Sequence, residues 1–148
     1  MTEYFTVTRT LRAPRELVFE ALTKPEHFAV WFGTAAVEVP QDSLTMEVRP
    51  GGAFRAVMLL PDGNRIDWAG EYQVVDPPAH LAMTLTDQPG DDTGLPVLFD
   101  LEETGDGTVL TIRQDRSDFS DEQVAATIAG YNSFIDDIED VLETLQTA

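Results

Sequence analysis

The side chains that could bind a metal or supply a nucleophile are few, and their spacing does not favour either role. His27 and His80 are the only histidines, and neither belongs to a His-x-x-x-His pair or an ordered set of carboxylates. Zinc needs three or four well-placed ligands. The chain has no cysteine, which excludes disulfides, thiol nucleophiles and thiolate metal sites. We therefore expect no metal site and no cofactor, and His80 is expected at the surface.

The acidic side chains favour a solvated surface over a binding site. Asp136, Asp137, Glu139, Asp140 and Glu143 lie opposite an apolar helical stripe, as on an exposed helix face. The acid-rich segment 115–122 lacks the central glycine and ligand order of a calcium loop. No Gly-x-Ser-x-Gly elbow, Walker loop or dinucleotide fingerprint is present. These absences leave no catalytic residue to assign from a motif.

Tyr131 and Gln114 are the polar residues best placed to act inside a core. A buried tyrosine usually needs a partner for its hydroxyl. If the last strand faces inward at Leu110, Ile112 and Gln114, then Gln114 is one partner for Tyr131, and a polar group of a ligand is another. Acid–base chemistry in the same space would have to use these two residues, with Arg55 and Arg113 as further candidates.

The C-terminal segment predicts the element that positions Tyr131. Ser120 and Gln123 have the spacing of a capping box, which starts a helix. The apolar residues that follow recur at alternating intervals of four and three and form one stripe of a long helix. These residues are Val124, Ile128, Tyr131, Ile135, Ile138, Leu142 and Leu145.

The preceding residues predict two short helices and a curved antiparallel sheet. One helix starts at Pro14, and a second, with a Thr23–Glu26 capping box, ends near Gly33. Alternating apolar residues predict the strands. Gly70 marks a bulge or bend in a strand whose residues Ile66, Trp68, Tyr72 and Val74 share one face. The predicted strands are 5–11, 35–40, 44–49, 53–60, 65–75, 80–87, 96–104 and 108–115, within a single domain over 1–148.

The charge of the chain excludes several classes of partner. Its 27 acidic and 9 basic residues give a net charge of −18, which repels nucleic acids and anionic membranes. No signal peptide is visible, and no apolar run approaches the ~20 residues that span a bilayer. We expect a cytoplasmic protein that binds no nucleic acid and no membrane. Solubility and adaptation to high salt both remain explanations of the acidity.

The order and spacing of the turn motifs resemble those of a known family over nearly the whole chain. The motifs are Arg12-Ala13-Pro14, Leu22-Thr23-Lys24-Pro25-Glu26, Trp31-Phe32, Arg49-Pro50-Gly51-Gly52, Pro61-Asp62-Gly63, Gly70-Glu71-Tyr72, Asp76-Pro77-Pro78, Gly107-Thr108-Val109-Leu110-Thr111-Ile112 and Gly130-Tyr131. Together they resemble bacterial proteins similar to the activator of heat-shock protein 90 ATPase, within the START-like (SRPBCC, Bet v 1-like) superfamily. Many members of that family have Gly-Trp where this chain has Gly130-Tyr131, and histidine where it has Gln114.

The resemblance implies an α+β helix-grip fold, in which a curved antiparallel sheet surrounds a long C-terminal helix and two short helices close one end. Members commonly enclose an apolar cavity, and the family offers no shared catalytic residues. The leading hypothesis is noncatalytic binding of an apolar or aromatic small molecule, in stress response or metabolism. A cyclase- or hydrolase-like enzyme and a co-chaperone-like interaction module remain alternatives, and a homodimer stays open. The predicted ligand-binding residues are Trp31, Phe54, Met58, Trp68, Tyr72, Met83, Phe99, Gln114, Tyr131 and Phe134.

Overall fold

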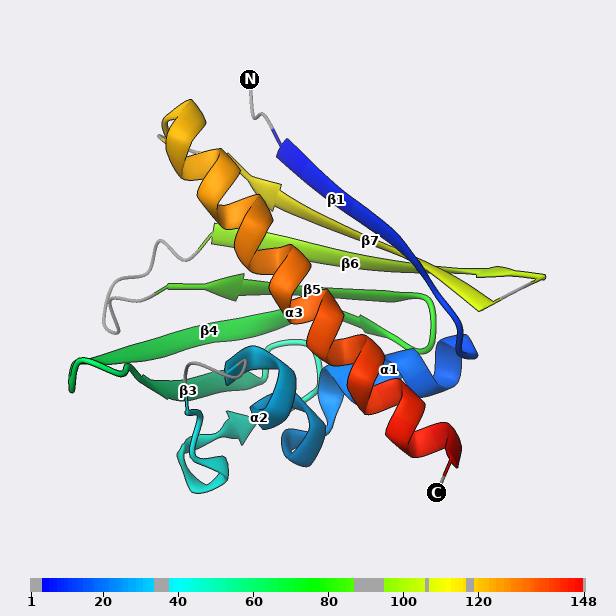
Figure 1. Ribbon diagram of the computed structural model, residues 1–148, viewed down its shortest axis with the longest axis horizontal. Helices are drawn as coiled ribbons and strands as arrows, with labels where there is room; N and C mark the ends of the chain where they lie inside the picture. The colour runs from blue at the N-terminus through cyan, green and yellow to red at the C-terminus, as the bar shows by residue number, and fades with distance from the viewer. Residues whose placement is uncertain (1–3, 34–37, 87–94, 106, 117–118, 148) are drawn as a thin grey trace.

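A seven-stranded antiparallel sheet forms one layer of the fold, with the strand order β1-β7-β6-β5-β4-β3-β2. The computed structural model describes residues 4–33, 38–86, 95–105, 107–116 and 119–147. Helix α3 lies diagonally across one face of the sheet, and α1 and α2 lie beside its C-terminal half (Figure 1). The elements are β1 (Tyr4–Leu11), α1 (Arg15–Thr23), α2 (Pro25–Gly33), a 3-10 turn (Gln41–Ser43), β2 (Thr45–Met46), β3 (Ala53–Leu59), β4 (Arg65–Asp76), β5 (His80–Leu85), β6 (Leu95–Thr104), β7 (Gly107–Asp115) and α3 (Asp121–Thr147).

The long helix α3 begins and packs as its sequence predicts. The Ser120 N–H donates to Gln123 Oε1 at 2.8 Å, and the Gln123 N–H donates to Ser120 Oγ at 3.1 Å. This capping box satisfies backbone donors that would otherwise lack partners at the helix start. The residues of the predicted stripe from Tyr131 onward bury their side chains against the sheet and the short helices. The most deeply buried are Tyr131, Ile135, Ile138 and Leu142.

The acidic face of α3 also holds the helix to the edge of the sheet. Arg9 of β1 donates to Asp136 at 2.5 Å and to Glu139 at 2.6 Å. Both carboxylates remain largely exposed, as expected for a solvated face. Exposed ion pairs stabilise weakly, so the apolar stripe carries most of the helix docking.

The predicted inward face of β7 is confirmed. Thr108, Leu110, Ile112 and Gln114 are all buried, whereas Arg113 between them is exposed. Successive side chains of a strand point to opposite faces. Gln114 therefore faces α3 together with the apolar residues of β7.

Strand β4 departs from the predicted face because of an irregularity in its pairing. The register between β4 and β5 shifts between Tyr72 and Val74. An extra residue in one strand reverses which of the following side chains face the core. The prediction that Val74 shares a face with Tyr72 is wrong: Val74 is 46% exposed, and Val75 packs against the core instead.

Gly70 lies where the pairing of β4 with β5 is interrupted. Ala69 and Thr86 form an isolated bridge before it, and regular pairing begins at Tyr72 and Met83. A Cβ on Gly70 would lie 1.9 Å from the carbonyl oxygen of Thr84. Glycine at this position permits β5 to approach the backbone of β4, as a close approach of two backbones requires.

The predicted capping box of the second helix is wrong. The Thr23 hydroxyl donates to the Phe19 carbonyl oxygen at 2.7 Å, so it ends α1 instead of starting α2. Helix α2 begins with backbone bonds from His27 and Phe28 to the Lys24 carbonyl. Threonine hydroxyls often bond back to the preceding turn, and here that local bond wins.

The segment between α2 and β3 is less regular than predicted. Of the strand expected at 44–49, only Thr45–Met46 pairs with β3. Half of the strand expected at 35–40, residues 35–37, lies outside the described residues. Its described part holds an isolated bridge between Glu38 and Leu59. The strand expected at 44–49 is thus shorter than its alternation suggested.

The architecture is the predicted α+β helix-grip fold: a curved antiparallel sheet, two short helices at one end, and a long C-terminal helix across the concave face. None of the helices in the described ranges is long and apolar enough to cross a bilayer. The question for function is how much of the space between the sheet and α3 is filled.

Candidate functional site

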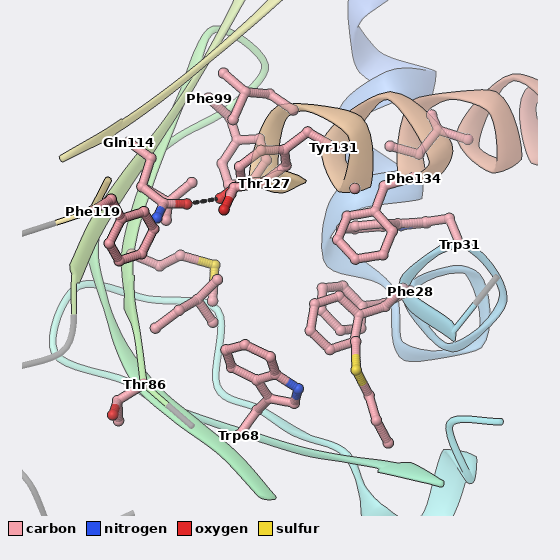
Figure 2. A pocket seen from close by; sticks show the side chains of 18 of the residues that line it. Phe28, Trp31, Trp68, Thr86, Phe99, Gln114, Phe119, Thr127, Tyr131 and Phe134 are labelled. Carbon is pink, nitrogen blue, oxygen red and sulfur yellow. Dashed lines mark hydrogen bonds between the residues drawn. The ribbon is translucent and has the colours of Figure 1, made fainter. Parts of the chain in front are cut away.

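A cavity of about 520 Å³ lies between the sheet and α3. This size falls in the usual range of small-molecule sites. Side chains from α2, α3 and the strands β3 to β7 surround it (Figure 2). The lining residues are Phe28, Trp31, Phe32, Met58, Trp68, Met83, Leu85, Thr86, Val97, Phe99, Ile112, Gln114, Phe119, Gln123, Thr127, Gly130, Tyr131, Phe134 and Ile138.

One face of α3 forms a wall of the cavity. The lining residues of the helix recur at spacings of three and four, apart from the adjacent pair Gly130 and Tyr131. A helix places such residues on a single stripe. A Cβ built on Gly130 would meet no atom within 4 Å, so this part of the wall borders open space. Glycine in a helix interior costs about 1 kcal/mol relative to alanine, and no neighbouring atom requires it here.

Aromatic rings from α2 line one end of the cavity. Phe28 stacks on Phe32 with ring centroids 4.7 Å apart, and Phe32 stacks on Phe134 of α3 at 5.3 Å. Trp31 meets Phe134 edge to face at 5.6 Å. The indole N–H of Trp31 donates to the Ala21 carbonyl oxygen at 2.7 Å, which ties α2 to α1. These contacts within the protein fix the positions of the α2 rings at the cavity wall.

The main polar feature of the cavity is the pair formed by Tyr131 and Gln114. The Tyr131 hydroxyl donates to Oε1 of Gln114, and both side chains are buried (Figure 2). Burial raises the pKa of Tyr131 above its usual value of 10.0, because the charged phenolate would lose its hydration. Tyr131 therefore stays protonated at neutral pH and cannot serve as a general base there.

Within the part of the chain that the structure describes, no charged side chain lines the cavity. The wall residues named above include no aspartate, glutamate, histidine, lysine or arginine. Among the described parts of the chain, no group of three or more potential ligands could hold a metal ion. The arrangement can therefore enclose an uncharged molecule, which it would contact mainly through aromatic, aliphatic and thioether groups.

A family model matches residues 12–143, and its description is activator of Hsp90 ATPase homolog 1-like protein. The chain belongs to this family. No curated protein matches the sequence. The START-like family assignment suggested by the turn motifs is thus confirmed, over a region that includes all of the lining residues named above.

Solved structures similar to this family member share its fold at low sequence identity. A protein of Chromobacterium violaceum is 21% identical with a TM-score of 0.82, over 95% of this chain and 98% of its own. An AHSA1 protein of Silicibacter pomeroyi is 21% identical with a TM-score of 0.82, over 96% and 99%. An AHSA1-like protein of Aeromonas hydrophila is 19% identical with a TM-score of 0.80, over 99% and 96%. These similarities establish the fold.

Within this AHSA1-like fold, most residues predicted from sequence to bind a ligand line the cavity. They are Trp31, Met58, Trp68, Met83, Phe99, Gln114, Tyr131 and Phe134. Their alternation along strands or their place on the helix stripe identified the inward faces. The Tyr131–Gln114 hydrogen bond, one of two alternatives considered, is also present.

Phe54 and Tyr72 lie outside the lining. Both are almost fully buried, and their rings contact each other edge to face at 6.3 Å. Phe54 also packs against Phe28 and Phe32, so the rings of α2 stand between it and the cavity. Strand alternation places a side chain on the inner face, but it does not say whether that side chain meets space or another ring.

Sequence reasoning missed several members of the wall. Phe28 and Phe32 flank the predicted Trp31 at helical spacing, which was the available signal. Gln123, Thr127 and Gly130 continue the stripe of Tyr131 toward the start of α3. The sequence prediction left these three residues out because they are polar or small, whereas the predicted ligand-binding residues are mostly large and apolar.

Proposed function

We propose that this protein binds an uncharged apolar or aromatic small molecule in the cavity between the sheet and α3, and does so without catalysis. The observation that carries the proposal is a space of about 520 Å³ that no charged side chain of the described residues lines. Transfer of an apolar surface from water into such a site is favourable. An ionised group would lose its hydration there without gaining a counter-charge.

The cyclase- or hydrolase-like alternative lacks support from the cavity wall. General acid–base catalysis requires a group whose pKa lies near the working pH, within hydrogen-bond reach of the substrate. Among the described residues that line the cavity, Tyr131 is the one titratable side chain, and burial moves its pKa upward. Arg55 and Arg113 are exposed on the opposite face of their strands. Neither arginine is available to a bound molecule.

The interaction-module alternative also lacks a specific observation in its favour. The exposed large hydrophobic residues of the described chain are Tyr4, Val30, Leu59 and Val74, and each belongs to a different element. Isolated exposed apolar residues are normal on protein surfaces, whereas docking sites form contiguous patches. A cytoplasmic location and a homodimer stay predictions from the sequence.

A fluorescence titration tests the proposal. Aminoanthracene, an uncharged aromatic probe, should bind the native protein at one site, with brighter and blue-shifted emission. Naphthalene should then displace it, and naphthoate, the same ring system with a carboxylate, should displace it at least about tenfold more weakly, because the wall offers no cation. Native mass spectrometry checks the stoichiometry of one.

Two results would contradict the proposed binding. If the native protein left aminoanthracene emission unchanged up to the solubility limit of the probe, the space would not be a ligand site. If naphthoate displaced the probe as well as naphthalene does, the bound site would not be this uncharged cavity.

A further inference from the structure

Gln114 presents an unused hydrogen-bond donor to the cavity. Its side chain is only 7% exposed and forms part of the cavity wall. The amide oxygen accepts from Tyr131, whereas the amide nitrogen has no hydrogen-bond partner among the described residues. Figure 2 shows the oxygen of Gln114 facing Tyr131 and the nitrogen turned away from it. This nitrogen is not one of the fully buried side-chain atoms that lack a partner, so it remains accessible from the cavity.

Tyr131 determines which end of the amide is open. An amide can turn so that either its carbonyl oxygen or its NH₂ group faces a given neighbour. The Tyr131 hydroxyl uses the oxygen as its acceptor, and among the described residues it has no other acceptor. The nitrogen is therefore the end that remains for a bound molecule. The cavity therefore contains a hydrogen-bond donor, Gln114 Nε2, whose orientation is fixed by the bond from Tyr131 to the amide oxygen.

We infer that the ligand is an uncharged aromatic molecule that carries a hydrogen-bond acceptor, such as a carbonyl oxygen, and that Gln114 Nε2 donates to it. This inference rests on the proposed binding function and adds the ligand's chemical class. Gln114 is the specificity-determining residue, and Tyr131 is the positioning residue that orients it. The aromatic rings of Trp68, Phe119 and Phe134 border the same space and contact the body of the ligand (Figure 2).

Because the open group is a donor, the site favours ligands that carry an acceptor over ligands that do not. A molecule with an acceptor at this position pairs the open nitrogen and keeps its own oxygen hydrogen-bonded. A hydrocarbon of the same shape leaves the nitrogen unpaired, and a hydroxyl group that accepts from it must find a further acceptor for its own hydrogen. Sites built to hydrogen-bond one ligand group discriminate strongly against analogues that cannot form the bond.

Fluorenone and fluorene provide a matched pair of probes, since they share a rigid tricyclic frame and differ in one carbonyl group. Their affinities are measured by displacement of aminoanthracene from the native protein and from three variants. Gln114→Leu combined with Tyr131→Phe removes both hydrogen-bonding partners together, which avoids leaving either one buried and unpaired. Arg113→Leu is the control, because it changes the neighbouring residue on the outer face of β7.

We expect the ratio of fluorenone to fluorene affinity to fall about three- to tenfold in the double variant, as loss of one neutral hydrogen bond predicts, and to stay unchanged in Arg113→Leu. Tyr131→Phe alone tests positioning. Without the hydroxyl, the amide is free to turn its oxygen toward the ligand. Fluorenol, which carries a hydroxyl group in place of the carbonyl, reports this change because it can donate to the turned oxygen. The ratio of fluorenone to fluorenol affinity should therefore fall in Tyr131→Phe, whereas a general loosening of the fold would not change this ratio.

The outcomes separate this inference from the proposed function. If fluorene binds and the ratio is the same in the native protein and the double variant, the cavity binds ligands but Gln114 does not select them, and the inference is overturned. If neither compound binds the native protein, the proposed function fails and the inference fails with it. A thermal melt of each variant confirms that the folded protein is being compared.

Discussion

Gly130 allows the cavity and a solid core to be distinguished by the sign of a stability change. It lies in the interior of α3, where glycine costs about 1 kcal/mol of helix stability relative to alanine. A Cβ at this position meets no atom within 4 Å. Gly130→Ala should therefore raise the free energy of unfolding by about 1 kcal/mol, or the melting temperature by roughly 3 °C in a chain of this length.

A larger side chain at the same position should block ligand binding. In Gly130→Leu, the helix still gains from the loss of glycine, and the added atoms enter the cavity wall. We expect aminoanthracene affinity to fall about tenfold, which corresponds to ~1.4 kcal/mol, or roughly the burial of two methylene groups. Ala129→Leu is the matched control, because Ala129 is the exposed neighbour on the same helix.

The assay combines thermal unfolding with probe titration on the three variants. A loss of stability of about 1–3 kcal/mol in Gly130→Leu would show that the space beside Gly130 is already filled, since that is the usual cost of overpacking a core. Unchanged probe affinity in a stable Gly130→Leu protein would show that the probe binds elsewhere. Either result would refute the reasoning that links Gly130 to an open, ligand-binding cavity.

Three further predictions concern stability. Gly70→Ala should destabilise the protein by more than the ~1–3 kcal/mol typical of overpacking, because the new Cβ would lie 1.9 Å from a backbone oxygen of β5; a urea midpoint within error of the native value would contradict this. Burial raises the pKa of both Tyr72 and Tyr131 above 10.0 in the folded protein. Above about pH 10 the unfolded chain therefore loses these protons first, and the free energy of unfolding falls. Urea titrations should show a shallower fall with pH in Tyr131→Phe than in the native protein. The net charge of −18 should make molar sodium chloride raise the melting temperature by screening repulsion, and a constant or lower melting temperature would show that repulsion does not limit stability.

The elements with strong local signals could be predicted from the sequence. The stripe from Val124 to Leu145 defined α3 because a helix repeats every 3.6 residues, and Ser120 with Gln123 marked its start. Alternation along β7 placed Gln114 on the inner face and Arg113 on the outer one. These signals depend on the backbone period alone, so they need no knowledge of the neighbouring elements.

Other features depended on a choice between competing local bonds or on contacts between distant segments. Thr23 offered two local hydrogen bonds, and the bond within α1 was formed instead of the cap of α2. The register shift after Tyr72 depends on how β4 pairs with β5, so the exposure of Val74 could not be inferred from β4 alone. Segment 44–49 had the alternation of a strand, but only Thr45–Met46 pairs with β3.

The candidate site also combines features that the sequence predicts with features that depend on tertiary packing. The sequence by itself determined the inward face of β7, the apolar stripe of α3, the acidic charge, and most of the predicted residues that line the cavity. The tertiary structure decided that Phe54 and Tyr72 pack against other rings, that Gly130 borders open space, and that the amide nitrogen of Gln114 is left free. Periodicity specifies the direction of a side chain, whereas the distance to the atoms opposite it depends on how sheet and helices are docked.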